Sequence, residues 1–142
     1  MAEYLMGIDA GTGSVRVALF DFRGQNRAYA VAEYGTTYPK NGWAEQSDYE
    51  WFEALKKAIP ECIKKAGIAA DNIAAITCDA TTNTLVYLDE NDTSVRPPIL
   101  WMDVRATEEA SFIDTIREEY DATKFYKPGF RADTMVPKCM EI

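Results

Sequence analysis

The sequence predicts an α/β domain in which helices flank a mixed β-sheet. Extended patterns come first, over residues 4–34, and two glycines interrupt the first pair of them. From about residue 47 onward, helical and extended patterns alternate along the chain. Strands that are followed by alternating strands and helices are typical of a mixed sheet with helices on its faces.

The composition is that of an ordinary globular protein. The 142 residues are 47% hydrophobic and 27% charged, which suffices for one domain with a real core, so we treat residues 1–142 as a single domain. The net charge of -8 disfavours nucleic acid as a partner. Because the sequence has no histidine, Ser-His-Asp triads and histidine-ligated zinc are excluded within this chain. Any general acid or base within this chain is then expected to be a carboxylate.

The cysteines and the hydropathy pattern indicate a cytoplasmic protein. Cys62, Cys78 and Cys139 are odd in number and lie in apolar contexts, which predicts reduced core thiols rather than disulfides. No basic leader precedes an apolar run, and no segment reaches the roughly 20 apolar residues that a membrane span needs. We therefore expect no membrane partner.

The first two strands are predicted within residues 4–21. Val15, Val17 and Leu19 recur at every second position, as a half-buried strand requires. Arg16 is then expected on the wetter face. Residues 27–34 predict a third strand, with Ala28, Ala30 and Ala32 on one face, so the first three strands should form an antiparallel meander.

The turn of the first hairpin has the composition of an anion site. Gly11 and Gly13 lack a Cβ and tolerate positive φ, so the backbone N–H groups of residues 11–14 are expected to converge on a phosphate. The hydroxyls of Thr12 and Ser14 would add donors. A strand follows the turn, whereas a P-loop or a Rossmann turn opens a helix. The alternative is an ordinary hairpin whose polar side chains bond the turn backbone.

The middle of the chain predicts one long helix. Residues 38–43 form a loop with proline and glycine, and Ser47 and Glu50 have the spacing of a capping box. The helix is expected over about 48–66, with Gly67 as its C-cap. Pro60 removes a backbone donor, so we expect a kink or a short break there.

The later elements are predicted from shorter patterns. A strand over 72–79 should bury Ile73 and Ile76, and Asp103 should N-cap a later helix. The remaining elements are a strand at 85–88, a turn at 89–92, an extended segment at 99–101, a helix over about 104–119, a turn at 127–129 and a helix that begins near 134.

The pattern Asp9-x-Gly11-Thr12-x-Ser14-x-Arg16 resembles the first phosphate-binding hairpin of the actin, Hsp70 and sugar-kinase ATPase fold. Four later segments narrow the resemblance. They are Tyr38-Pro39-x-x-Gly42-Trp43-x-Glu45-Gln46, Ile73-Ala-Ala-Ile76-Thr, Leu100-Trp101-Met-Asp103-x-Arg105 and Met135-Val-Pro137-Lys138. In that order and spacing they are similar to the amino-terminal domain of the FGGY carbohydrate kinases, across almost the whole chain. The resemblance implies a ribonuclease H-like half-domain.

The resemblance also implies ATP and Mg²⁺ as ligands of the hairpin. Asp9 would orient water bound to Mg²⁺, and Arg16 would add local positive charge. The residues that would face the β- and γ-phosphates are Gly11, Thr12, Gly13 and Ser14. None of these is a general base. The family's catalytic aspartate and its C-terminal lobe are expected after Ile142, so this chain alone should be inactive and should need the remaining part of the kinase.

The implied acceptor is a ketopentose of the ribulose or xylulose type. Glycerol kinases carry Gln-Arg-Glu and xylulokinases Gln-Met-His where this chain has Asp79-Ala80-Thr81, which is similar to the ribulokinase-like branch. Trp101, Asp103 and Lys138 match positions that border the sugar. The residues alone leave other roles open, which are a turn former for residues 79–81, a core aromatic for Trp101, a helix cap for Asp103 and a solvated lysine for Lys138. Trp43, Glu45 and Gln46 are interpreted as structural.

A second function class stays open. Actin- and Hsp70-type modules use the same hairpin to sense a nucleotide and move a partner, and a half-domain can serve as a non-catalytic interaction module. The segments around Trp43 and Trp101 favour the sugar kinase. A homodimer is compatible with either class.

Overall fold

The structure is a computed structural model that describes residues 3–116 and 131–140. Its contacts divide the chain into two compact units, and each is described by itself. The first, called the sheet unit, consists of Met1–Gly35 and Ser47–Thr81, and the second unit consists of Thr36–Gln46 and Thr82–Ile142. The assignment of residues 1–142 to a single domain stays a prediction.

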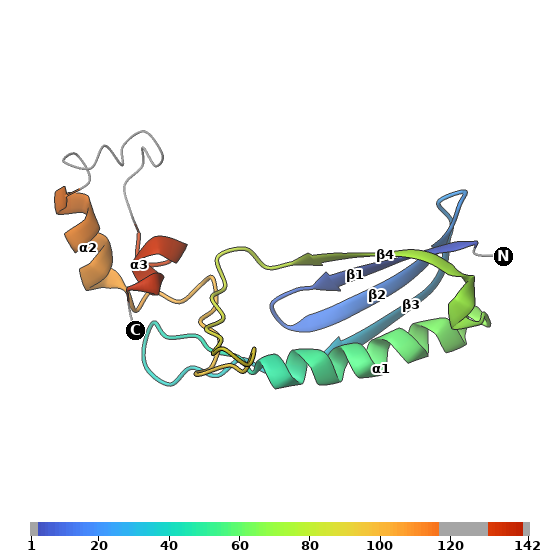
Figure 1. The fold of residues 1–142 in the computed structure, drawn as a ribbon, viewed down its shortest axis with the longest axis horizontal. Coiled ribbons are helices and arrows are strands. Elements are labelled where there is room, and N and C mark those ends of the chain that lie inside the picture. The colour runs from blue at the N-terminus through green and yellow to red at the C-terminus, as the bar shows by residue number, and fades with distance from the viewer. Residues whose placement is uncertain (1–2, 117–130, 141–142) are drawn as a thin grey trace. The chain divides into compact units, whose positions relative to one another are not determined.

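The sheet unit contains a four-stranded mixed sheet, as predicted (Figure 1). Its strands are β1 (Tyr4–Ala10), β2 (Ser14–Asp21), β3 (Asn26–Glu33) and β4 (Ile73–Ala80), in the order β3-β2-β1-β4. The first three pair antiparallel and confirm the predicted meander, whereas β4 runs parallel to β1. A parallel pair needs a crossover connection, and helix α1 (Asp48–Ala66) with the short 3₁₀ helix η1 (Ala70–Asn72) supplies it.

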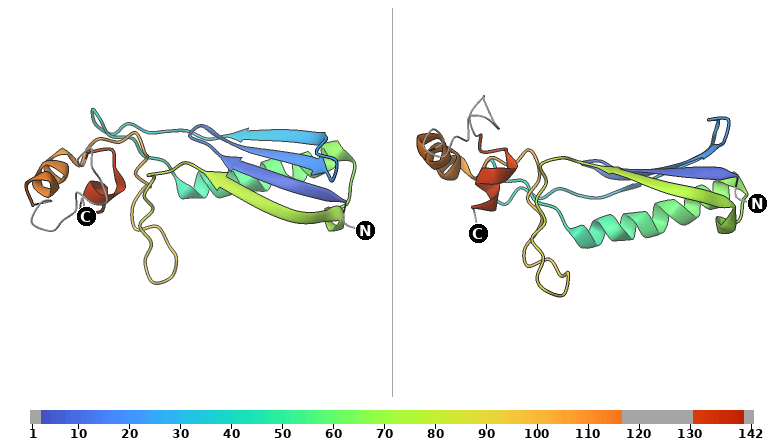
Figure 2. Two further views of the ribbon diagram at one scale, coloured as in Figure 1. Left: turned by 90° about the horizontal axis from the view of Figure 1, so that it is seen from above. Right: turned by 45° about the horizontal axis from the view of Figure 1, so that its top comes forward.

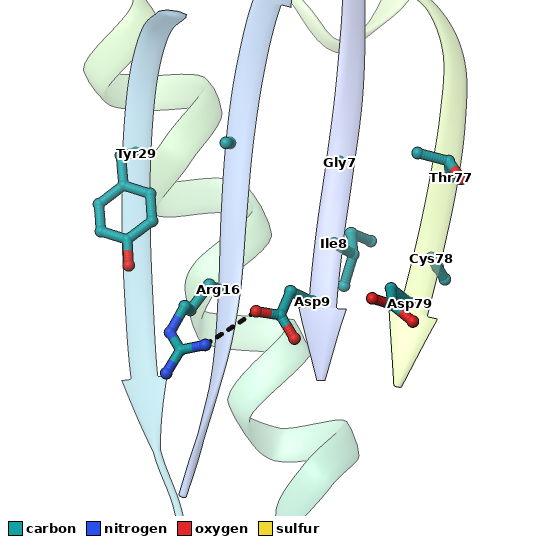
Figure 3. A pocket seen from close by; sticks show the side chains of 9 residues that line it. Gly7, Ile8, Asp9, Arg16, Tyr29, Thr77, Cys78 and Asp79 are labelled. Atoms are coloured by element: carbon teal, nitrogen blue, oxygen red, sulfur yellow. Dashed lines mark hydrogen bonds and ion pairs between the residues drawn. The ribbon is translucent and has the colours of Figure 1, made fainter. Parts of the chain in front are cut away.

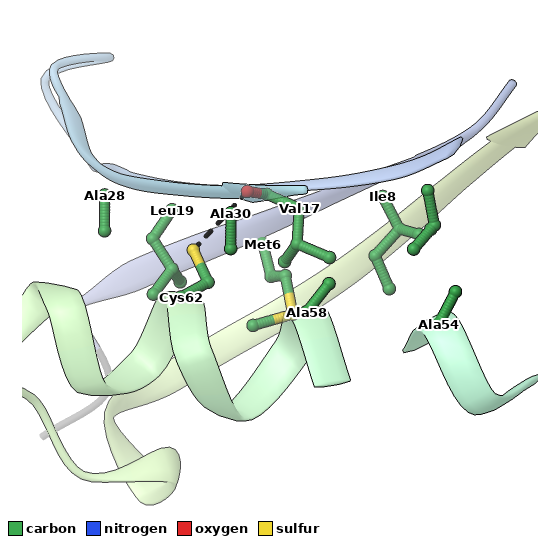
Figure 4. Packing of buried hydrophobic residues seen from close by; sticks show 10 residues of the cluster. Met6, Ile8, Val17, Leu19, Ala28, Ala30, Ala54, Ala58 and Cys62 are labelled. Carbon is green, nitrogen blue, oxygen red and sulfur yellow. Dashed lines mark hydrogen bonds between the residues drawn. The ribbon is translucent and has the colours of Figure 1, made fainter. Parts of the chain in front are cut away.

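Helix α1 lies along one face of the sheet (Figure 2) and closes the core. The alternating residues of β2 point into this core, and Val15, Val17 and Leu19 are almost completely buried, as predicted. Small side chains on α1 and β3 allow the close packing seen in Figure 4. The buried core residues are Met6, Ile8, Val15, Val17, Leu19, Ala28, Ala30, Ala54, Ala58 and Cys62.

The ends of α1 fall where the sequence predicts them, but their chemistry differs. Ser47 occupies the N-cap position, yet its side chain makes no capping hydrogen bond, so the predicted capping box is wrong. Glu50 instead accepts a long hydrogen bond from the N–H of Gly35 (3.4 Å). Gly67 is the C-cap with φ of 67°, as predicted. The helix continues through Pro60, so no break occurs there.

Strand β4 lies at the edge of the sheet and is mostly exposed. Ile76 is 59% exposed and Ile73 is half-buried, so the predicted burial of Ile76 is wrong. Helix α1 packs chiefly against β2 and β3, and of the β4 side chains Ile73 is the one that packs against the core among the described residues. Cys78 and Cys139 are also exposed, and the expectation of core thiols holds for Cys62, whose pKa is raised chiefly by burial.

The segments 36–46 and 82–106 of the second unit have little regular structure. Isolated bridges join Thr37 to Glu45, Glu45 to Ile99 and Ile99 to Leu85, so the predicted strand at 85–88 is reduced to single bridges. The turn at 89–92 is confirmed, because the carboxylate of Asp89 accepts hydrogen bonds from two backbone N–H groups. No helix in the described residues of either unit is long and apolar enough to cross a membrane.

Two helices lie in the described residues of the second unit. Helix α2 (Thr107–Ile116) begins three positions later than the sequence predicts, and α3 (Met135–Cys139) forms where a helix from 134 is expected. Residues 117–119 of the predicted helix and the predicted turn at 127–129 lie outside the described residues.

Candidate functional site

The turn between β1 and β2 is fixed by its own backbone and by the end of β3. The N–H of Gly11 donates to the carbonyl of Ser14 (3.0 Å), and the N–H of Tyr34 donates to the carbonyl of Gly13 (3.2 Å). The hydroxyl of Tyr34 donates to the carbonyl of Gly11. The Gly11 N–H is therefore used inside the turn, and the prediction that it points at an anion is wrong. Tyr34 is an anchor that the sequence did not reveal, because only the folded hairpin brings it near.

The two glycines are not required by backbone conformation. Neither has a positive φ, although glycine tolerates one. A Cβ on Gly11 would make ordinary contacts, the nearest at 3.4 Å to Nη1 of Arg16, and a Cβ on Gly13 would meet nothing within 4 Å. Since the fold of the chain does not demand glycine at position 13, the missing side chain leaves open space beside the turn.

Asp9 and Arg16 lie opposite each other in the β1–β2 register and form an ion pair. Nη1 of Arg16 lies 2.8 Å from Oδ2 of Asp9, and about half of each side chain is exposed (49% and 47%). The hydrogen bond to Asp9 raises the pKa of Arg16, so the guanidinium stays charged. Arg16 is on the wetter face, as predicted, and both groups remain accessible to a ligand.

These side chains line a shallow pocket of about 350 Å³ on the sheet face opposite α1 (Figure 3). Asp79 on β4 is the register partner of Asp9 on β1, so two carboxylates stand side by side at the carboxyl ends of parallel strands. Oδ1 of Asp79 accepts the N–H of Ala80 (2.9 Å). The lining residues are Gly7, Ile8, Asp9, Arg16, Ala18, Tyr29, Thr77, Cys78 and Asp79.

Two carboxylates of this pocket are the described groups that would suit a magnesium ion carried by a phosphate. The described residues include no cluster of three or more metal-ligating side chains. Mg²⁺ however keeps several waters and commonly uses one or two carboxylates together with substrate phosphates. Asp9 and Asp79 offer such a pair. That Asp9 acts through water is what the resemblance implies, and it stays a prediction.

In the second unit, Asp103 is the centre of a buried charged cluster. Its carboxylate accepts hydrogen bonds from the N–H of Ala44 (2.6 Å) and from Nε (2.9 Å) and Nη2 (2.7 Å) of Arg105. Glu45 pairs with the same guanidinium at 2.8 Å, and the guanidinium stacks 3.7 Å from the ring centre of Trp43. The predicted N-cap role of Asp103 is wrong, because α2 starts at Thr107. Trp43 and Glu45 both contact the Arg105 guanidinium, and their interpretation as structural residues stays a prediction.

Lys138 belongs to the same unit and is completely buried. Its ammonium donates to the carbonyls of Leu100 (2.8 Å) and Trp101 (3.1 Å). Burial lowers its pKa, against the opposing effect of the Asp103 and Asp133 carboxylates. The alternative role of Lys138 as a solvated lysine is therefore wrong. Trp101 is 44% exposed, so it is not a core aromatic.

Acid is expected to remove the stability that Asp103 provides. Burial alone would raise its pKa, but the hydrogen bonds from Arg105 and Ala44 outweigh burial and hold the pKa below its ordinary value. A carboxyl with a lowered folded pKa stabilises the fold above its unfolded pKa of about 3.9, and this contribution is lost as the pH falls through the folded pKa. Asp103→Asn should flatten the pH dependence of the unfolding free energy below about pH 4. Urea unfolding at several pH values tests this, and equal slopes for both proteins would contradict it.

Comparison with known proteins adds an independent line of evidence. The N-terminal domain of the FGGY family of carbohydrate kinases matches residues 4–138. A glycerol kinase from Rhizobium meliloti (strain 1021) is 32% identical over 135 residues, which are 94% of this chain and 27% of that protein. A xylulose kinase from Staphylococcus epidermidis is 34% identical over 118 residues, which are 82% of this chain and 24% of that protein.

Comparison with solved structures also finds a carbohydrate kinase. The crystal structure of a xyloylose kinase from Brucella ovis matches with a TM-score of 0.82 at 27% identity, over 94% of this chain and 27% of that chain. The chain thus spans about a quarter of the length of the relatives that it matches.

Proposed function

The chain belongs to the FGGY family of carbohydrate kinases, and from this membership we propose that it is the amino-terminal part of an ATP-dependent kinase that phosphorylates a ketopentose. Its sheet has the actin, Hsp70 and ribonuclease H-like ATPase fold of the sugar kinases that it matches. The observation that carries the proposal is the open hairpin turn beside the Asp9–Arg16 pair and Asp79. We place the enzyme in the cytoplasm.

We propose that the hairpin holds the β- and γ-phosphates of ATP. The open space at Gly13 lets a phosphate approach the turn. Thr12 is half-buried and Ser14 is 8% exposed, and we propose that their hydroxyl groups donate to the phosphate once it is bound. Arg16 contributes positive charge locally in a protein of net charge -8. Phosphoryl transfer requires chiefly placement and charge stabilisation, which these groups can provide.

Asp9 and Asp79 are the residues that would hold Mg²⁺. When bound, the ion would neutralise charge on the phosphates during transfer. The two carboxylates would hold the water shell of the ion, and the ion pair with Arg16 fixes the carboxylate of Asp9. We propose that the general base lies in the remaining part of the kinase, and that the 142-residue chain alone has negligible turnover.

The sugar class rests on residues 79–81. The segment Asp79-Ala80-Thr81 differs from the signatures of glycerol kinases and xylulokinases and resembles the ribulokinase-like branch. We propose that these residues contact a ketopentose. For the second unit, taken by itself, we propose the exposed indole of Trp101 as a sugar contact. Asp103 and Lys138 are wholly buried, so we assign them supporting roles.

A substrate panel tests the proposal. The full-length gene product is expected to consume ATP with ribulose or xylulose, and more slowly or not at all with glycerol. A ketopentose at about 100 times its dissociation constant should also stabilise the protein by about 2.7 kcal/mol in thermal unfolding. Stabilisation by ATP but by none of the sugars would instead favour a nucleotide-sensing module of the actin or Hsp70 type.

A further inference from the structure

Trp101 sits in a tight turn whose backbone is held from several directions. The N–H of Asp103 donates to the carbonyl of Leu100 (3.0 Å), which closes a four-residue turn with Trp101 at its second position. The N–H of Leu100 donates to the carbonyl of Ala44 (3.0 Å). The turn therefore presents a half-exposed indole from a fixed backbone.

Lys138 holds the other side of this turn. Its ammonium bonds the carbonyls of Leu100 and Trp101, which are the two peptide groups that set the direction of the indole. The hydroxyl of Tyr87 donates to the carbonyl of Lys138 (2.6 Å) and anchors α3. Burying an ammonium group costs free energy unless it is hydrogen-bonded, so these two carbonyls account for its presence.

We propose that Lys138 is a positioning residue that fixes the Trp101 indole for sugar binding and does not itself touch the sugar. This inference rests on the proposed function. The lysine side chain has no exposed surface, whereas the indole does. The charged groups that face the lysine are the carboxylates of Asp103 and Asp133 and the guanidinium of Arg105, all within the second unit.

The test uses Lys138→Met in the full-length gene product, with Lys64→Met as the matched control at an exposed lysine of α1. ¹⁹F NMR of fluorotryptophan-labelled protein, with the Trp101 signal assigned by Trp101→Phe, reports the indole directly. We expect Lys138→Met to shift and broaden this signal without sugar, and to raise KM for the sugar about three- to tenfold, the cost of ordering one free side chain. Lys64→Met should change neither, and kcat should change little in both.

A double-mutant cycle separates positioning from direct contact. In a Trp101→Ala background, Lys138→Met should add no further increase in KM. An equal increase in both backgrounds would mean that the lysine contacts the sugar, which overturns the proposal, as would an unchanged Trp101 signal in Lys138→Met.

A milder variant covers the case in which Lys138→Met does not fold. Tyr87→Phe removes one hydroxyl and should shift the Trp101 signal in the same direction by a smaller amount, and an unchanged signal would overturn the proposal. If the wild-type protein phosphorylates no sugar, the proposed function fails, while the NMR signal still decides whether Lys138 positions the indole.

Discussion

Replacing Asp103 by alanine should lower the free energy of unfolding by about 3–5 kcal/mol, because one partner of a buried ion pair is lost. Arg105 would stay buried, since its side chain and that of Asp103 have no exposed surface. The N–H of Ala44 would also lose its acceptor, which costs about 1–3 kcal/mol for a buried donor. Glu45 remains as a partner for the guanidinium and keeps the loss from being larger.

Urea unfolding followed by tryptophan fluorescence measures this effect, because Trp43 stacks on the guanidinium of Arg105. Nη1 of Arg105 is already buried without a hydrogen-bond partner among the described residues, and loss of Asp103 would remove the acceptor of Nε as well. Glu61→Ala is the matched control, since it breaks an ion pair with Lys65 whose two side chains are about half exposed. Exposed pairs contribute about 0.2–1 kcal/mol. Similar losses in both variants would contradict the buried role of Asp103.

The sheet unit could be predicted from the sequence because its determinants are local. The period of two in Val15, Val17 and Leu19 sets which face of β2 is buried, and helix α1 ends at a glycine with positive φ. Strand β4 was predicted from the sequence, but the exposure of Ile76 was not. That exposure depends on which strands α1 covers, which no local pattern specifies.

The contacts of the second unit could not be predicted from local patterns, because the residues that make them are distant in sequence. Asp103 looks like a helix cap when it is considered with its neighbours, yet the donor that fixes it belongs to Ala44, 59 positions earlier. Lys138 looks solvated for the same reason, since the carbonyls that it binds are 38 and 37 positions away. Arg105 is part of the sequence segment that contains Trp101 and Asp103, but its ion pair with Glu45 was not predicted.

Gly13→Val tests the hairpin, and we expect it to lower kcat/KM for ATP about 100-fold while the fold is kept, which corresponds to about 2.7 kcal/mol. The position does not have a positive φ, and a Cβ there meets no atom within 4 Å, so the chain itself tolerates a side chain. The added methyl groups would instead fill the space through which a phosphate reaches the turn. A displacement of about 1 Å from the reactive position is enough for a 100-fold loss.

Gly35→Val is the matched control, because a Cβ on Gly35 also meets nothing within 4 Å and the residue lies outside the pocket. Steady-state kinetics at varied ATP and thermal unfolding are measured for both variants. Equal melting temperatures with a selective loss of kcat/KM in Gly13→Val mean that glycine at this position serves the phosphate rather than the fold. If Gly13→Val instead retains full activity, the phosphates do not approach the β1–β2 turn, and the hairpin is structural despite its resemblance to an ATP-binding loop.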